Sequence, residues 1–132
     1  MNLDFSKKEI LTDFDDKSLP VEVNLENSER RAGEDHYHSG IDFLEYLQNF
    51  ISVRRKEMPK GSYTTKLFES GINKIAQKVG EEAVELVIEA KDQNDELFLN
   101  EAADLMYHFI VLLIARGYNL NDVANVLKTR HK

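Results

Sequence analysis

The sequence predicts an all-α fold, a bundle of four to five helices, on three observations. From residue 41 onward the apolar residues recur with helical spacing, no segment alternates as a strand does, and glycine and proline fall where helices should end. The chain has 132 residues, about the size of one domain, which is long enough to bury a core without disulfide bonds or a structural metal.

Five helices are expected, over residues 41–57, 63–70, 72–91, 95–116 and 120–130. The first presents one apolar face at i, i+3, i+4, i+7 and i+8, formed by Phe43, Leu44, Leu47, Phe50 and Ile51. The run MPKGS then breaks the chain, and Gly71 ends the second helix. Asn94 or Asp95 can cap the fourth helix, and Gly117 can supply its left-handed stop.

Residues 1–40 differ from the rest of the chain. They hold ten acidic and five basic side chains, a net charge of −5, whereas residues 41–132 hold fourteen and twelve, a net of −2. They contain the alternating run VEVNL, which can form one short strand, followed by a polar stretch with Gly33 and Gly40. We therefore expect an acidic N-terminal extension or linker over 1–40, with room for partial disorder, and one all-α domain over 41–132.

Composition excludes several classes of protein. The absence of cysteine removes disulfide scaffolds, zinc fingers, thiolate iron–sulfur sites and cysteine nucleophiles. A net charge of −7 argues against nucleic-acid binding, which needs a basic face. The N-terminus lacks a signal-peptide pattern, and the apolar run from Leu105 to Ala115 is too short to span a membrane. The expectation is a soluble, cytoplasmic protein.

The helix over 95–116 carries carboxylates in an apolar setting. Glu101, Asp104 and His108 share a narrow stripe, and most of the remaining circumference is apolar. A helix that is apolar all round is a buried, central helix. Glu101 and Asp104 should therefore lie inside the core or at its rim, where a charge needs a cation, a basic side chain or a proton as partner.

The preceding helix adds more carboxylates. Glu82 and Glu85 share one face, and the short DQN connection makes the two long helices an antiparallel hairpin. The pairs Glu82/Glu85 and Glu101/Asp104 can then converge, each with its members one turn apart. Four carboxylates in a partly dry pocket repel strongly unless a divalent cation binds, and all-oxygen ligands suit Mg²⁺ or Mn²⁺.

Magnesium held by carboxylates usually acts on phosphates, so basic side chains are expected nearby. The candidates are Lys66, Lys74, Lys78, Arg54, Arg55 and the residues from Arg130 to Lys132. Each feature also has a simpler interpretation. Glu-x-x-Glu is most often a solvated helix face, the basic residues can be ordinary surface charge, and Tyr107 and His108 can be core residues.

Two runs carry a resemblance to a known family: SYTTKLFESGINKIAQKVGEEAVELVIEA and NEAADLMYHFIVLLIARG, with a closing RHK. They resemble phosphoribosyl-ATP pyrophosphatase, a histidine-biosynthesis family within the MazG-like all-α nucleotide pyrophosphohydrolase superfamily. The similarity covers about residues 41–132. The Glu-x-x-Glu…Glu-x-x-Asp signature is moderately specific by itself, and together with SYT, KVGEE and DLMYH in order it is strong.

The resemblance implies Mg²⁺-dependent hydrolysis of 1-(5-phosphoribosyl)-ATP to 1-(5-phosphoribosyl)-AMP and pyrophosphate, the second step of the pathway. It makes four residues the metal ligands: Glu82, Glu85, Glu101 and Asp104. Glu81, next to Glu82, becomes the carboxylate that orients or deprotonates the attacking water. Position in the shared motifs makes further residues substrate-binding: Ser62, Tyr63, Thr64 and Lys66 on a substrate-facing loop, with Lys74, Lys78, Tyr107 and His108.

The superfamily also implies a homodimer whose paired helices build a four-helix core. In many bacteria this domain follows a phosphoribosyl-AMP cyclohydrolase half of about a hundred residues with cysteine zinc ligands. Residues 1–40, without cysteine, cannot supply that half, so we expect no cyclohydrolase activity. They can be a remnant, a lineage-specific extension or a cloning artefact. Two alternative functions remain: a house-cleaning nucleoside triphosphate pyrophosphohydrolase, and a non-catalytic helical dimerisation module.

Overall fold

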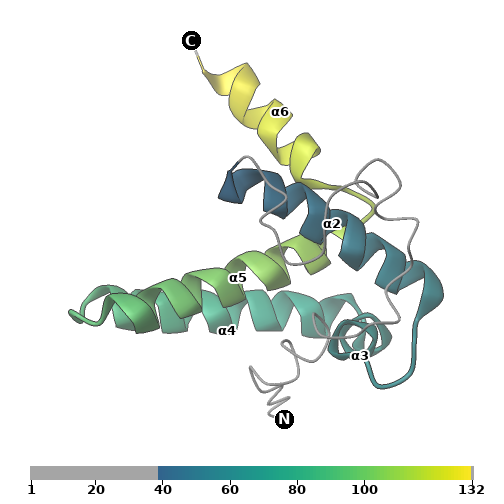
Figure 1. Ribbon diagram of the computed structural model, residues 1–132, viewed down its shortest axis with the longest axis horizontal. Coiled ribbons are helices and arrows are strands. Elements are labelled where there is room, and N and C mark those ends of the chain that lie inside the picture. Colours follow the sequence, from purple (N-terminus) through teal and green to yellow (C-terminus); the bar gives the residue numbers. More distant parts are fainter. Residues whose placement is uncertain (1–38, 132) are drawn as a thin grey trace. The chain divides into compact units, whose positions relative to one another are not determined.

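The structure is a computed structural model that describes residues 39–131. Those residues form five helices and no strand: α2 (Gly40–Glu57), α3 (Tyr63–Ser70), α4 (Ile72–Ala90), α5 (Asp95–Ala115) and α6 (Leu120–Arg130) (Figure 1). The all-α prediction is confirmed, and every expected helix ends within a residue of its predicted limits. The short strand expected at 21–25 and the extension expected over 1–40 lie outside the described residues, apart from Ser39 and Gly40.

The chain divides into two compact units, one up to Thr65 and one from Lys66 onward, and each is described by itself. In the first unit, α2 buries the predicted apolar face, with Leu47, Phe50 and Ile51 almost fully covered. Arg54 is buried on the same face, where its guanidinium carbon lies 4.8 Å from the centroid of the Phe50 ring. The cation therefore stacks on the aromatic ring instead of reaching solvent.

In the second unit, α4 and α5 pack side by side as a helical hairpin (Figure 1). The turn over residues 91–94 reverses the chain, and the Asn94 side chain accepts a hydrogen bond from the Leu97 backbone N–H at 3.1 Å. This is the predicted N-cap, which satisfies one of the free N–H groups of the first turn. The hairpin is the frame on which the carboxylates of the two helices can meet.

The prediction that α5 is buried all round is wrong for its first half. Ile110, Val111 and Ile114 in the second half are buried, but Leu99 is 63% exposed and Met106 is 38% exposed. By length and composition α5 could also cross a membrane. The core helix of a soluble protein meets the same criterion, and α5 packs along α4 and buries Glu101. A soluble core helix is the better interpretation.

The end of α5 is a Schellman motif, as the position of Gly117 predicts. The Gly117 N–H donates to the Ile114 carbonyl at 2.9 Å, and the Tyr118 N–H donates to the Leu113 carbonyl at 2.8 Å. Gly117 has a φ of 84°, which costs a residue with a Cβ atom conformational energy. The chain then enters α6, which buries none of its residues and extends away from the α4/α5 hairpin (Figure 1).

We predict that Gly117→Ala destabilises the protein by about 1–2 kcal/mol because alanine must adopt the left-handed conformation. A Cβ atom at this position would meet no neighbour within 4 Å, so the cost is purely conformational. Gly80 is the matched control, because it lies inside α4 and has equally open surroundings. Gly80→Ala should stabilise by about 0.5–1 kcal/mol. Urea unfolding of both variants measures the two opposite signs, and a stabilising Gly117→Ala would contradict the argument.

Candidate metal centre

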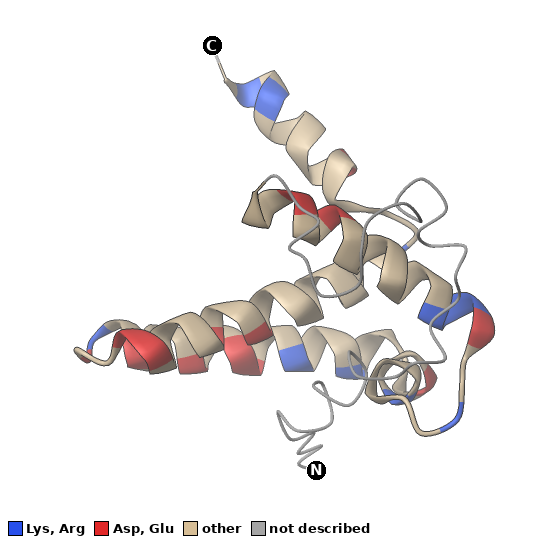
Figure 2. Ribbon diagram, in the orientation of Figure 1, with Lys and Arg blue, Asp and Glu red and all other residues tan. Residues whose placement is uncertain are grey.

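Helix α4 presents basic residues first and acidic residues afterwards on one face. Figure 2 shows blue positions in the first half of α4 and red positions in its second half, beside red positions on α5. The stripe runs through Lys78, Glu82, Glu85 and Glu89 at spacings of three and four residues, which places their side chains one turn apart. The sequence therefore creates a charge gradient along this face of the hairpin.

Three of the four predicted metal ligands meet between α4 and α5. One carboxylate oxygen from each of Glu82, Glu85 and Glu101 lies within 4.8 Å of the other two. Glu82 and Glu101 are only 6% and 8% exposed, whereas Glu85 is exposed. The cluster therefore has two buried carboxylates and one that is exposed to solvent.

Hydrogen bonding between the carboxyl groups of this triad, together with burial, changes the protonation of Glu85. The neighbouring Glu101 carboxylate, burial and the Glu82 carboxylate together raise the pKa of Glu85 from 4.5 to about 7. In the metal-free protein, one of the three carboxylates therefore holds a proton until the pH approaches neutrality. A bound cation removes the need for that proton.

The triad fits a divalent cation by its donor set and by an unsatisfied atom. Glu82 Oε2 is buried and has no hydrogen-bond partner among the described residues, which is costly for a charged group. Carboxylate oxygens are the ligands that Mg²⁺ and Mn²⁺ prefer, and Mg²⁺ is usually bound by few protein groups and several waters. Three converging carboxylates therefore suit such an ion and leave positions for a phosphate.

Asp104, the fourth predicted ligand, is half-buried one turn after Glu101 on α5, but its carboxylate is not one of the oxygens that meet in the triad. Its backbone carbonyl accepts a hydrogen bond from His108 Nδ1 at 2.6 Å. A metal-binding role for Asp104 stays a prediction.

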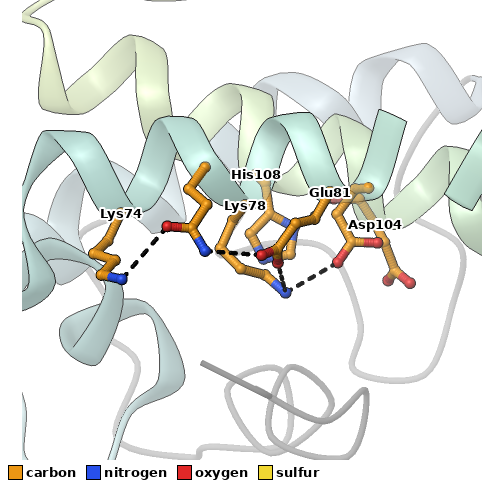
Figure 3. A network of polar contacts seen from close by, with 7 residues as sticks. Lys74, Lys78, Glu81, Asp104 and His108 are labelled. Atoms are coloured by element: carbon orange, nitrogen blue, oxygen red, sulfur yellow. Dashed lines mark hydrogen bonds and ion pairs between the residues drawn. The ribbon is translucent and has the colours of Figure 1, made fainter. Parts of the chain in front are cut away.

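Next to the triad, Glu81 belongs to a polar network along α4 (Figure 3). Glu81 Oε1 accepts a hydrogen bond from Gln77 Nε2 at 2.9 Å, and Gln77 Oε1 accepts one from Lys74 Nζ at 3.4 Å. The Gln77 hydrogen bond, helped by Lys78, lowers the pKa of Glu81 below 4.5. Glu81 is therefore ionised at neutral pH. The sequence interpretation did not assign Gln77, although its positions three residues after Lys74 and four before Glu81 place it within reach of both.

Lys78 joins this network to the triad. Its Nζ lies 3.3 Å from Glu82 Oε1 and 3.5 Å from Glu81 Oε2, and both Lys78 and Glu82 side chains are only 9% exposed. The sequence predicted a phosphate-binding lysine at this position. The structure shows this ammonium paired with two carboxylates, and phosphate binding by Lys78 stays a prediction.

His108 and Tyr107 are buried, at 1% and 3% exposure. Burial lowers the pKa of His108 below 6.5, so the imidazole is neutral at pH 7. Because the Asp104 carbonyl can only accept, Nδ1 carries the proton and Nε2 presents a lone pair. His108 is therefore an acceptor at Nε2, and a substrate-binding role stays a prediction for both residues.

Tyr63, Thr64 and Lys66 lie in α3, as the helix expected over 63–70 requires, so the substrate-facing loop that the resemblance implies is limited to Ser62. Ser62 precedes α3, and its Oγ accepts a hydrogen bond from the Thr65 N–H at 3.2 Å, as an N-cap does. Tyr63 and Thr64 are buried, whereas Lys66 is exposed. Substrate binding by these residues stays a prediction, with Lys66 the one whose side chain is open to solvent.

The arrangement defines a class: an all-α protein with a cluster of carboxylates between two antiparallel helices. A family profile described as "PRA-PH: Phosphoribosyl-ATP pyrophosphohydrolase" matches residues 44–131, two thirds of the chain. This chain belongs to the phosphoribosyl-ATP pyrophosphohydrolase family.

Curated relatives agree with this assignment. The chain is 63% identical over 91 residues to the "Histidine biosynthesis bifunctional protein HisIE" of Bacteroides thetaiotaomicron, a match that covers 69% of this chain and 45% of that protein. It is 40% identical over 91 residues to the "Phosphoribosyl-ATP pyrophosphatase" of Leptospira biflexa, with 69% of this chain and 99% of that protein covered. The chain thus spans less than half the length of the bifunctional relative.

A third relative extends the similarity toward the N-terminus. The HisIE protein of Caldanaerobacter subterraneus subsp. tengcongensis is 37% identical over 134 residues, covering 95% of this chain and 65% of that protein. About seven residues of this chain are left uncovered, so the match includes most of the segment before Ser39.

We predict that stabilisation by Mg²⁺ grows as the pH rises from 5.5 to 8. Folded, metal-free protein keeps the Glu85 proton up to about pH 7, whereas the unfolded chain loses it near 4.5. The folded state therefore binds more protons in this range, and its stability falls as the pH rises. Mg²⁺ must displace that proton, so its effect on Tm is small at pH 5.5 and larger at pH 8.

Glu85→Gln should abolish most of this pH dependence, and Glu45→Gln, an exposed carboxylate on α2, should leave it unchanged. The difference between wild type and Glu85→Gln separates Glu85 from His108. The lowered pKa of that buried imidazole makes stability rise with pH, which is the opposite sign. An equal Mg²⁺-induced Tm shift at pH 5.5 and pH 8 in wild type would contradict the prediction.

Proposed function

We propose that this chain catalyses the Mg²⁺-dependent hydrolysis of 1-(5-phosphoribosyl)-ATP to 1-(5-phosphoribosyl)-AMP and pyrophosphate, the second step of histidine biosynthesis. The observation that carries the proposal is the meeting of Glu82, Glu85 and Glu101 within 4.8 Å, in a chain that belongs to the phosphoribosyl-ATP pyrophosphohydrolase family. The names of the relatives support the substrate. Mn²⁺ is an expected substitute for Mg²⁺, because both ions accept oxygen ligands.

The metal-binding role falls to Glu82, Glu85 and Glu101, with Asp104 as the expected fourth ligand. The chemistry that Mg²⁺ supplies when bound is a lowered pKa of coordinated water, polarisation of the phosphoryl group and neutralisation of the leaving pyrophosphate. Glu82 and Glu101 are fixed by burial between the two helices. They would therefore hold an ion at a fixed position between the two helices. The exposed Glu85 marks the solvent side of the cluster, from which a substrate can reach the ion.

The role proposed for Glu81 is to orient the attacking water. Its lowered pKa keeps it ionised at neutral pH, so it accepts a hydrogen bond from water throughout the working range. Its place next to Glu82 in the sequence puts it within one residue of the metal ligands. A carboxylate with a low pKa is a weak base, which favours orientation of the water over full removal of its proton.

The phosphates of the substrate are assigned to the basic end of the stripe on α4. Lys74 is half-buried and Lys78 is buried, and both lie on the N-terminal side of the carboxylates. A triphosphate that reaches the metal from this side passes these two ammonium groups. The solvent-exposed Lys66 on α3 is a third candidate.

We also propose that the chain is a cytoplasmic homodimer. A mostly apolar groove of about 350 Å³ lies on the α4/α5 hairpin, lined by Leu86, Ala102, Leu105, Met106 and Phe109. The same two helices expose further large apolar residues, namely Val84, Val87, Ile88, Leu97 and Leu99. A second copy of the hairpin would cover this surface and complete a four-helix core.

Glu82→Gln and Glu101→Gln should each lower the rate of pyrophosphate release from phosphoribosyl-ATP by at least about 100-fold. Loss of a supporting partner outside the ligand shell already costs 10–100-fold, and each of these changes removes a ligand. The fold should survive, because each change relieves repulsion within the triad. Glu45→Gln is the control, and the measurement is pyrophosphate release with and without Mg²⁺, with circular dichroism to verify folding.

The same assay separates the proposed function from its alternatives. Faster hydrolysis of ordinary deoxynucleoside triphosphates than of phosphoribosyl-ATP would favour a house-cleaning pyrophosphohydrolase. A chain that neither hydrolyses any of these nucleotides nor is stabilised by Mg²⁺ would be a non-catalytic helical module.

For the assembly, we expect wild type to elute with about twice the 15.3 kDa mass of one chain. Met106→Glu places a charge in the apolar groove and should shift the mass toward the monomer. Val126→Glu, on the exposed surface of α6, is the control and should not. Multi-angle light scattering after size exclusion measures both, and a monomeric wild type would contradict the proposal.

A further inference from the structure

Lys78 occupies an unusual place beside the triad. Its ammonium lies 3.3 Å from Glu82 Oε1, while the other oxygen of the same carboxylate, Oε2, is buried without a hydrogen-bond partner among the described residues. Glu82 also contributes an oxygen to the cluster with Glu85 and Glu101. Glu82 is therefore shared: its Oε1 pairs with the Lys78 ammonium, and the same carboxylate belongs to the triad that would hold a metal ion.

An ordinary i, i+4 ion pair on a helix surface is a weak interaction, because solvent and salt screen it and its side chains are mobile. This pair is different, since both side chains are only 9% exposed. Burial is the main cause of the lowered pKa of His108, and the nearby charge of Lys78 lowers it further. Figure 3 shows Lys78 and His108 together with Glu81. The Lys78 side chain is therefore largely shielded from solvent, so its charge is less screened than that of a surface lysine.

We propose that Lys78 is a built-in second cation of the metal centre, which weakens metal binding in the free enzyme and strengthens the binding of the metal-associated phosphate. The inference rests on the proposed function. Glu82 would then serve both cations, because its Oε1 pairs with Lys78 and its carboxylate is one of the three that would hold the metal. Lys78 would contact the phosphate directly, from a place that its ion pair with Glu82 sets.

The charges give the size of the effect. A metal ion held by the carboxylate that pairs with Lys78 at 3.3 Å would lie about 6 Å from the ammonium. Even with water-like screening, repulsion between a double and a single positive charge at that separation corresponds to about tenfold in the dissociation constant. A phosphate that lies between the two cations is attracted to both, and a charged hydrogen bond from Lys78 is worth about tenfold or more in its binding.

Removing the charge of Lys78 should therefore move two measured constants in opposite directions. In Lys78→Met, the Kd for Mg²⁺ alone, measured by isothermal titration calorimetry at pH 8.5, should fall about tenfold or more. The KM for phosphoribosyl-ATP at saturating Mg²⁺ should rise about tenfold or more. A purely structural role would weaken both, because a loosened site binds neither partner well.

Two further variants sharpen the test. Lys78→Arg keeps the positive charge and should restore a Kd for Mg²⁺ close to that of wild type. Lys91→Met removes a lysine from the exposed C-terminal end of the same helix and should change neither constant. If Lys78→Met does not fold without metal, as judged by circular dichroism, Lys78→Gln keeps a polar end and takes its place.

Failure of the inference and failure of the proposed function give different results. An active wild type with unchanged or weaker Mg²⁺ binding in Lys78→Met and Lys78→Gln overturns the role of Lys78 alone. A wild type that neither binds Mg²⁺ nor hydrolyses phosphoribosyl-ATP overturns the proposed function itself.

Discussion

The structure of the second unit depends on one constraint: negative charge buried between two helices must be balanced there. Glu82 and Glu101 are almost fully covered where α4 meets α5, and an uncompensated carboxylate in such a place is strongly destabilising. The protein balances the charge in two ways. Lys78 pairs with Glu82 from one side, and Glu85 takes up a proton because its pKa is raised to about 7.

Helical spacing explains why the carboxylates of the site are unequal. Residues three apart are offset by about 60° around a helix. Glu82 and Glu85 are therefore covered to different extents where α4 meets α5, and the structure buries the first and exposes the second. The same offset separates Glu101, which is buried and within the triad, from Asp104, which is half-buried and outside it. One helix contact thus yields a closed side that fixes an ion and an open side that admits a substrate.

Much of the fold could be predicted because the signals are local. Gly71, Asn94 and Gly117 end or begin helices through their own conformation or side chain. These helix boundaries can therefore be predicted from a few neighbouring residues. The meeting of Glu82, Glu85 and Glu101 followed from a shared face and a short connection. The cap at Ser62 was not predicted, because a serine before a helix fits a polar loop residue and a helix cap equally well.

What could not be predicted depends on individual atoms. Spacing indicated that Lys78 lies one turn before Glu82, but not that one oxygen of Glu82 is paired while the other is left unsatisfied. Nor did it indicate that Gln77 links Lys74 to Glu81. These details follow from side-chain conformations and burial, which many sequences with the same spacing would not share.

The charge balance favours a divalent ion over other occupants of the site. Glu82, Glu85 and Glu101 carry three negative charges when fully ionised, and Lys78 supplies one positive charge. A divalent cation brings this group to neutrality without any proton on Glu85. A monovalent ion would leave one uncompensated charge between the helices. A second lysine would have to bring its ammonium group to the same carboxylate oxygens. Glu81 is also ionised and lies 3.5 Å from Lys78, so the surroundings of the loaded site stay negative and do not attract a triphosphate at long range. Selection of the substrate must therefore come from short-range contacts, and the ammonium next to Glu82 is the nearest group able to provide one.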